Sequence, residues 1–492
     1  MFQGTGSGVG KSIIVAAFCR ALKRRGIRVA PFKAQNMALN SFVTADGKEM
    51  GRAQVFQAEA CGLVPDVRMN PVLLKPSADS TSQVILMGQA RGHLSAVSYY
   101  ERSRIHWDVV TRAYDSLAKD YEVIVMEGAG SPAEINLQKT DIVNMKMAEY
   151  AGAPVIIVSD IDRGGVFASL KGTFDLVRPR HRSLIKAFLI NKFRGDVRLL
   201  EPGIEMFGQI VPVPVLGVLP WFRDIHVDEE DGVFVKRLTS KDHTLADLEI
   251  AVIRLPRISN FTDFSPFSFE PGVGIKIVAN PQEAAGCHMI IIPGTKATTS
   301  DLAFLRDRGW FEWLERFVCG DGLIVGICGG YQMLGQEIVD EYGTDGRAGT
   351  YKGLSLLPVH TVMAPEKTLR QVRFGLFNPA LSLQEMEIQG YEIHMGRTWC
   401  KEECEGLGQG LGPEIGVFDE KRGVLGTYIH GIFENDTFRS ALLNLVRRRH
   451  GMKEVSSSFN YKRFKALQFD LLADWFEGAC DMESLIGILY GH

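Results

Sequence analysis

The sequence predicts an α/β protein with two domains, each built around a parallel sheet. Its 492 residues are enough for two or three domains of about 100–200 residues each. Short apolar runs bounded by glycine, proline or charge alternate with helix-like stretches in both halves of the chain. Such alternation is typical of doubly wound parallel sheets, which bind ligands at the carboxyl ends of their strands.

The first half is expected to form one domain, residues 1–245. A glycine-rich segment precedes a predicted helix from Lys11 to Arg25, which Gly26 would end. The predicted buried strands of this domain are Val29–Phe32, Val123–Met126, Val155–Val158, Ala187–Ile190 and Val215–Leu219.

The chain becomes polar between Val227 and Asp247, and we expect the domain boundary there. The second domain is predicted to span residues 246–450, followed by a helical, amphipathic tail, 451–492, packed on one of the domains. The predicted strands of the second domain are Glu249–Ile253, Ile275–Val278, Met289–Ile292 and Leu323–Ile327.

Composition and charge exclude some classes of function. The net charge of −3 leaves no broad basic surface, which argues against a nucleic-acid partner. No apolar run reaches the roughly 18–20 residues needed to cross a bilayer, and no signal peptide is evident. Eight cysteines without a paired framework favour a reducing compartment. We therefore expect a cytoplasmic protein without a membrane partner.

The cysteines outside any motif are expected to be inert. Cys400 and Cys404 lie near His394 and suggest a metal site, but one pair at this spacing is a weak signal. We interpret both as ordinary residues. The others are interpreted as buried, unreactive thiols: Cys19, Cys61, Cys287, Cys319 and Cys480.

The segment from Gly4 to Ser12 predicts a phosphate-binding loop at the start of the first helix. Gly8 and Gly10 would let backbone N–H groups turn toward phosphate oxygens, and the helix N-terminus favours negative charge. Lys11 would reach the β- and γ-phosphates and Ser12 would bind Mg²⁺. The loop is one residue longer than the strict pattern. The alternative is a glycine-rich turn with a chance Gly-Lys-Ser.

A carboxylate and an amide end two other predicted strands of this domain. Glu127 follows Val123–Met126 and would hold Mg²⁺ as a Walker-B-type acid. The alternative is a glutamate in a turn at the strand end. Asn191 follows Ala187–Ile190, where it would read the nucleotide base or serve as an ordinary turn residue.

Only Met1, Phe2 and Gln3 precede the phosphate loop. A strand that leads into such a loop normally has about 5–6 residues. We therefore expect the native chain to begin several residues upstream.

A second motif lies in the C-terminal half. Gly326, Cys328 and Gly330 follow an apolar strand and precede a helix, which predicts a nucleophile elbow with cysteine in place of serine. His430 ends another apolar run and would act as the base. Backbone N–H groups of Gly294 and Gly329 would form the oxyanion hole. The alternatives are a small core thiol for Cys328 and a satisfied core histidine for His430.

These motifs resemble known families. The C-terminal half, with Cys328 and His430, resembles the class I triad-type glutamine amidotransferases, which implies a flavodoxin-like domain. The N-terminal half resembles the dethiobiotin-synthetase-like ATPases. Their fusion resembles the cobyrinic and cobyric acid amidases of cobalamin synthesis. The segments that favour the cobyric acid synthases are Pro31–Met37, Ser159–Phe167 and Gly390–Gly396.

The resemblance implies ATP and Mg²⁺ as cofactors, with Lys33 near the γ-phosphate. It also implies glutamine and a corrinoid, adenosylcobyrinic acid a,c-diamide, as substrates, amidated on the b, d, e and g side chains. A homo-oligomer is compatible with the family. Two alternatives stay open: the sister a,c-diamide synthase, and a P-loop switch protein with a decayed amidotransferase domain.

The third member of the triad is not assigned from sequence. Other triad amidotransferases carry glutamate two residues after the histidine. Ile432 occupies that place here, and Glu434 comes two residues later.

Overall fold

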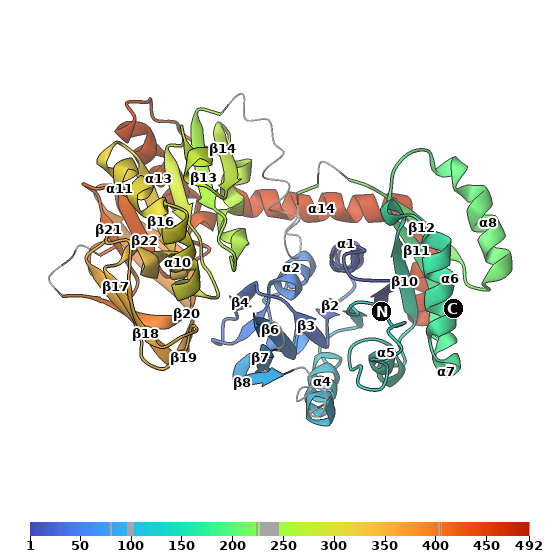
Figure 1. Cartoon of the computed structure of the whole chain (residues 1–492). Helices are drawn as coiled ribbons and strands as arrows, with labels where there is room; N and C mark the ends of the chain where they lie inside the picture. The colour runs from blue at the N-terminus through green and yellow to red at the C-terminus, as the bar shows by residue number, and fades with distance from the viewer. Residues whose placement is uncertain are drawn as a thin grey trace. The chain divides into compact units, whose positions relative to one another are not determined.

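The computed structural model describes residues 1–78, 81–95, 103–222, 225–226, 246–401, 404 and 406–491 (Figure 1). The chain forms two compact units. Unit 1 comprises Met1–Ala38, Lys48–Glu230 and Arg463–His492, and unit 2 comprises Leu39–Gly47 and Asp231–Lys462. Most of the polar stretch that predicts the domain boundary, residues 227–245, lies outside the described residues.

Unit 1 is built on parallel strands whose positions match the predicted apolar runs. A four-stranded sheet has the order β1 (Phe2–Gly4), β10 (Val155–Asp160), β11 (Ile185–Phe193), β12 (Val215–Pro220). The other parallel pair is β2 (Val29–Phe32) with β9 (Val123–Met126). A parallel bridge between Phe2 and Glu127 connects β1 with the end of β9. The carboxyl ends of β1 and β9 therefore lie side by side.

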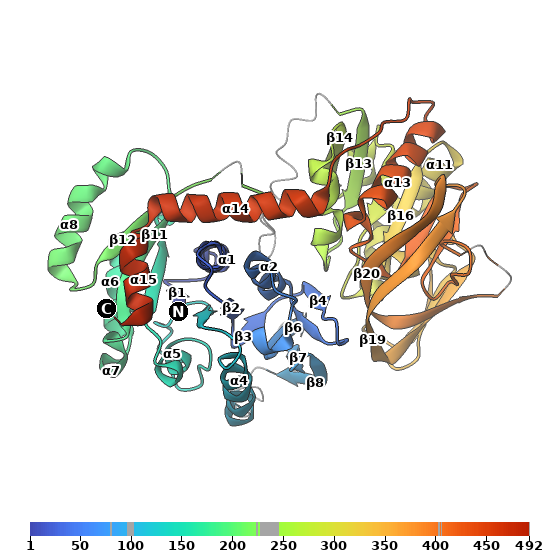
Figure 2. The ribbon, with the colours of Figure 1, turned by 180° about the vertical axis from the view of Figure 1, so that it is seen from behind.

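Helices cover both faces of this sheet, as Figures 1 and 2 show: α6 (Val166–Leu176) lies on one face and α15 (Met482–Tyr490) on the other. Helix α1 (Lys11–Arg24) ends one residue earlier than predicted, and Gly26 follows it with a φ of 80°. Phe18 of α1 packs against Phe2 and against Phe476 of α14 (Tyr461–Ala479). The helical tail thus packs on the hydrophobic core of unit 1.

The remaining elements of unit 1 include a small sheet that the sequence analysis did not predict. Its order is β3 (Gln35–Met37), β6 (Val72–Ala78), β7 (Thr81–Leu86), β8 (Gln89–Ser95), and only the β3–β6 pair is parallel. The other regular elements are β5 (Glu49–Gly51), α2 (Arg52–Cys61), α4 (Ser103–Leu117), α5 (Met145–Ala151), α7 (Pro179–Arg182) and α8 (Glu201–Ile210).

Unit 2 contains a six-stranded sheet that includes every strand predicted for the second domain. Its order is β14 (Val273–Val278), β13 (Leu248–Ile253), β15 (Met289–Ile292), β16 (Leu323–Ile327), β22 (Val424–Thr427), β21 (Gly416–Asp419), and only β21 is antiparallel. Ile250 and Val252 share one core with α13 (Asp436–Arg449). Ala251 and Ile253 share another with α10 (Thr298–Asp307) and α11 (Trp310–Cys319). Alternate residues therefore face opposite layers of helices.

A second sheet of unit 2 was not predicted. Its order is β18 (Gly349–Lys352), β17 (Glu337–Asp340), β19 (Val359–Asn378), β20 (Leu383–Cys400), β23 (Ile429–His430). Strands β19 and β20 form a long antiparallel hairpin. The pairing of β20 with β23 sets Tyr391 opposite His430. Strand β4 (Ser41–Val43) also belongs to unit 2.

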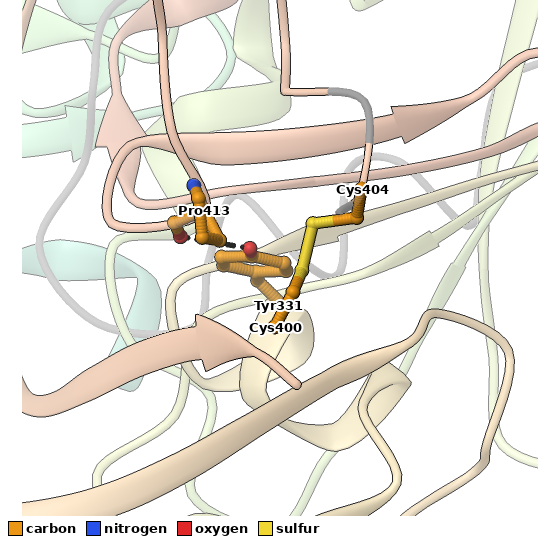
Figure 3. The surroundings of a disulfide bond; sticks show 4 residues. All are labelled: Tyr331, Cys400, Cys404 and Pro413. Carbon is orange, nitrogen blue, oxygen red and sulfur yellow. Dashed lines mark hydrogen bonds between the residues drawn. A yellow bond between two sulfur atoms is a disulfide. The ribbon is translucent and has the colours of Figure 1, made fainter. Parts of the chain in front are cut away.

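The cysteines differ from the prediction in two respects. Cys400 and Cys404 form a disulfide (Figure 3), so reading them as ordinary residues was wrong. Cys319 is exposed rather than buried, and Cys480 is half-buried. A spacing of four residues does not by itself indicate that two cysteines pair, so the sequence contained no sign of this bond. The neighbouring Tyr331 hydroxyl donates to the Pro413 carbonyl at 2.8 Å.

Two kinds of feature are missing from the part of the chain that the structure describes. None of its helices has the length and hydropathy to cross a membrane. Nor do its histidine, cysteine and acidic side chains form a cluster of three suited to a metal ion. The ring nitrogens of His394 instead form two hydrogen bonds. Nε2 pairs with Glu392 Oε2 at 3.2 Å, and Nδ1 pairs with the Gly396 carbonyl oxygen at 2.8 Å.

Candidate active sites

The phosphate loop of unit 1 connects the end of β1 to the start of α1. Gly8 and Gly10 have φ values of 72° and 98°, the left-handed region that glycine adopts at little cost. Lys11 Nζ donates to the carbonyls of Gly6 at 2.9 Å and Gly130 at 3.2 Å. The side chain predicted to bind phosphate therefore connects the phosphate loop with the segment that follows Glu127.

Glu127 is the centre of a buried polar cluster beside this loop, and its side chain is 1% exposed. Its Oε1 accepts hydrogen bonds from Ser12 Oγ at 2.9 Å and from Lys33 Nζ at 2.7 Å. Its Oε2 accepts from Gln57 Nε2 of α2 at 2.6 Å. The fold thus brings together four side chains that are far apart in sequence, three of them predicted site residues.

The electrostatics of the cluster favour a charged Glu127. Burial alone would raise the pKa of this carboxyl. The ammonium of Lys33 and the hydrogen bonds from Lys33 and Gln57 outweigh burial and hold the pKa below its ordinary value. Glu127 is therefore available as an anionic ligand at neutral pH.

The residues also fit a bound Mg²⁺ ion. Two adjacent ligands of an octahedral Mg²⁺ with bonds of about 2.0–2.1 Å lie roughly 2.9 Å apart. Ser12 Oγ and Glu127 Oε1 have that separation, 2.9 Å, and both are oxygen ligands. An ion at this position would compete with Lys33 for Glu127 Oε1.

Asn191 contacts the phosphate loop itself. Its Nδ2 donates to the Val9 carbonyl at 2.8 Å, and its Oδ1 accepts from the N–H of Lys192. A Cβ atom on Gly10 would lie 2.2 Å from that Nδ2. Asn191 therefore supports the loop and explains the need for glycine at position 10, whereas its contact with a nucleotide base stays a prediction.

Cys328 of unit 2 lies on a sharp turn between β16 and α12 (Gly329–Leu334). Its φ of 53° and ψ of −108° are unusual for a residue with a side chain, and such strain is typical of a functional site. A Cβ on Gly330 would lie 2.0 Å from the Ile292 carbonyl oxygen, and one on Gly326 would lie 2.5 Å from Leu334. The glycines two residues before and after the cysteine are thus sterically required.

His430 is oriented by a carboxylate that the sequence analysis missed. Its Nδ1 donates to Asp263 Oδ2 at 2.7 Å, and Asp263 Oδ1 accepts from the Gly431 N–H at 3.0 Å. The histidine is 1% exposed and the aspartate 4%. This contact leaves Nε2 as the ring nitrogen able to take a proton, and Nε2 has no hydrogen-bond partner among the described residues.

Asp263 lies in a 3₁₀ segment, Phe261–Phe269, that follows β13. An acid buried among phenylalanines was the available signal, because a buried carboxylate needs a partner. The partner could not be found from spacing, because the two residues are 167 positions apart. Ile432, at the place where other triad amidotransferases carry glutamate, is fully buried in the core.

The environment of His430 favours its protonated form. Burial alone would lower the pKa of the imidazole. The Asp263 carboxylate outweighs burial, and with a smaller contribution from the Cys328 sulfur it raises the pKa to about 10. The arrangement suits a nucleophile and an acid–base group that exchange a proton.

The loops predicted to form the oxyanion hole lie beside these residues. A Cβ on Gly294 would be 3.4 Å from Cε1 of His430, and one on Gly329 would be 3.3 Å from the Thr295 nitrogen. The backbone at Gly294 and that at Gly329 are therefore neighbours, with His430 next to them. Their role as oxyanion donors stays a prediction.

Comparison with known proteins agrees with this division of chemistry. Residues 1–233 match the model of the CobQ/CobB/MinD/ParA nucleotide binding domain, and residues 249–438 match that of the CobB/CobQ-like glutamine amidotransferase domain. Cobyric acid synthase of Citrobacter koseri is 47% identical over 100% of this chain and 98% of its own length. Those of Klebsiella pneumoniae strain 342 and Salmonella arizonae are each 46% identical with the same coverage. The chain belongs to the cobyric acid synthase family.

Proposed function

We propose that this protein converts the b, d, e and g carboxylates of adenosylcobyrinic acid a,c-diamide into amides during cobalamin biosynthesis, with ATP and glutamine. The observation that carries the proposal is that the fold gathers two sets of predicted reactive side chains, one in each unit. One has a phosphate loop beside Ser12, Lys33 and Glu127, and the other combines Cys328, His430 and Asp263. Full-length similarity to cobyric acid synthases supports the choice of substrate.

In unit 2, Cys328 attacks the carboxamide carbon of glutamine after His430 Nε2 has taken the thiol proton. Backbone N–H groups at Gly294 and Gly329 stabilise the oxyanion of the tetrahedral intermediate. His430 returns the proton to the leaving ammonia, and water then hydrolyses the thioester to give glutamate. Asp263 holds the imidazole in the tautomer that this exchange needs.

In unit 1, the corrinoid carboxylate attacks the γ-phosphate of ATP, which gives an acyl phosphate and ADP. Ammonia then displaces phosphate and leaves the amide. Ser12 and Glu127 would hold Mg²⁺, which supplies positive charge for the phosphate oxygens. With the ion on Glu127, Lys33 would turn toward the γ-phosphate and stabilise the charge that develops there.

The test is mass spectrometry of corrinoid products formed with ATP and glutamine. We expect four successive replacements of a carboxylate by a carboxamide on the a,c-diamide. Amidation only at a and c of cobyrinic acid would identify the sister synthase instead. Absence of glutamine hydrolysis would favour the P-loop switch protein. Cytoplasmic location and homo-oligomeric assembly stay predictions, to be checked by fractionation and by light scattering.

Asp263→Asn is expected to reduce the kcat for glutamine hydrolysis on the order of 10²-fold, because the imidazole loses the carboxylate that orients it. The pH profile should change as well. With a wild-type pKa of about 10, His430 stays protonated up to that pH and can give its proton to the leaving ammonia. Without the carboxylate, burial lowers the pKa, and the alkaline limb should move to lower pH. Steady-state glutaminase assays across pH measure both effects.

The matched control is Asp307→Asn, at the exposed end of α10, which should leave rate and profile unchanged. An Asp263→Asn enzyme with the wild-type rate and the same alkaline limb would contradict the assignment.

A further inference from the structure

The segment Leu39–Gly47 belongs to unit 2, although the rest of that unit begins at Asp231. It also lies outside residues 249–438, which match the amidotransferase family model. The described contacts of this segment reach two residues beside His430: Asn260, which begins the turn carrying Asp263, and Tyr391 of β20. Both contacts are built from buried groups.

The first route runs through the backbone of Asn260. Asn40 Oδ1 accepts the Asn260 N–H at 2.7 Å, and Asn260 Oδ1 accepts the Ser41 N–H at 3.2 Å. The carbonyl of Asn260 accepts the Asp263 N–H at 3.0 Å, and Asp263 binds His430 at 2.7 Å. A short series of hydrogen bonds therefore connects Asn40 with the imidazole.

Asn260 needs such support. Its φ of 53° and ψ of 42° lie in the left-handed region, which asparagine adopts more readily than most residues but still at some cost relative to glycine. The residue is 5% exposed, so its N–H cannot turn to water if an acceptor is lost. Asn40 supplies that acceptor. Position 260 thus depends on the segment for the conformation that places Asp263.

The second route runs through an aromatic ring. Tyr391 stacks on His430, with ring centroids 5.3 Å apart and an angle of 21° between the planes. The Tyr391 hydroxyl donates to the Ser41 carbonyl at 3.4 Å. The Phe42 ring packs against the Tyr391 ring, with centroids 4.8 Å apart. The segment therefore contacts both Asn260, which positions Asp263, and Tyr391, which stacks on the imidazole.

We infer that residues 40–42 are part of the glutaminase site and that Asn40 is a positioning residue for His430. The inference rests on the proposed hydrolysis of glutamine by unit 2. It implies that residues 249–438 alone lack part of this site. Asn40 touches no reacting atom, and it acts by fixing Asn260, and through it Asp263.

The experiment is Asn40→Ala in the full chain. We expect the kcat for glutamine hydrolysis to fall on the order of 10-fold to 100-fold, with little change in KM, because the glutamine-binding groups stay in place. The alkaline limb of the pH profile should move to lower pH as the contact between Asp263 and His430 loosens. Amidation with free ammonia should keep the wild-type rate. Asn40→Asp, which keeps an acceptor for the Asn260 N–H, should restore most of the rate.

The matched control is Asp46→Ala, on the exposed turn of the same segment, which should behave as wild type. Unchanged kcat and pH profile in Asn40→Ala would overturn the inference. An equal loss of ammonia-dependent activity would also overturn it, because the segment would then serve folding or synthesis. If the unaltered protein hydrolyses no glutamine, the proposed function and this inference fail together.

Discussion

Cys328→Ala is expected to abolish glutamine-dependent amidation and to leave ammonia-dependent amidation at the wild-type rate. The thiol is the only group at the elbow able to form the thioester, so no ammonia is released without it. The proposed synthetase site consists of residues of unit 1, which the substitution does not touch. The smaller side chain should also relieve little of the strain at φ 53°, since alanine keeps its Cβ.

The measurement compares corrinoid amide formation with glutamine and with ammonium chloride as nitrogen source. Cys319→Ala removes an exposed thiol from the end of α11 and is the matched control. It should leave both activities intact. Loss of ammonia-dependent synthesis in a folded Cys328→Ala protein would contradict the separation of the two sites.

Lys11→Ala is expected to stop amide formation with either nitrogen source, by a factor on the order of 10³ or more, since the β- and γ-phosphates lose the cation predicted to contact them. The substitution also removes the hydrogen bonds to Gly6 and Gly130 that hold the loop. Nucleotide affinity should therefore fall together with the rate. Titration with ATP and measurement of ADP release test both effects.

Lys23→Ala is the matched control, because Lys23 lies exposed on the last turn of the same helix. It should retain ATP binding and synthesis. Amidation at the wild-type rate in Lys11→Ala would show that ATP is bound elsewhere.

The strands could be predicted because buried parallel strands are short, continuous apolar runs. Val29–Phe32 and Met289–Ile292 have the predicted bounds, residue for residue. The elbow and the phosphate loop could be predicted for a related reason. Both depend on glycines close to one reactive side chain. The backbone conformation that they allow is determined by residues adjacent in sequence, so it can be predicted from a short motif.

The β19–β20 hairpin was missed because the middle of β19 is partly exposed and polar, so its pattern does not stand out from that of a loop. The disulfide was missed because a spacing of four residues does not by itself indicate that two cysteines pair.

The sequence by itself determined the α/β class and the positions of nine parallel strands, and it predicted Lys11, Cys328 and His430 as the reactive groups. Only the tertiary structure decided how those groups are held. Asp263 meets His430 across 167 positions, and Asn40 meets Asn260 across 220. Periodicity and local motifs report on neighbours in the chain, whereas a buried carboxylate or amide is satisfied by whichever group the packed core brings to it. The orienting residues of this site are of that second kind.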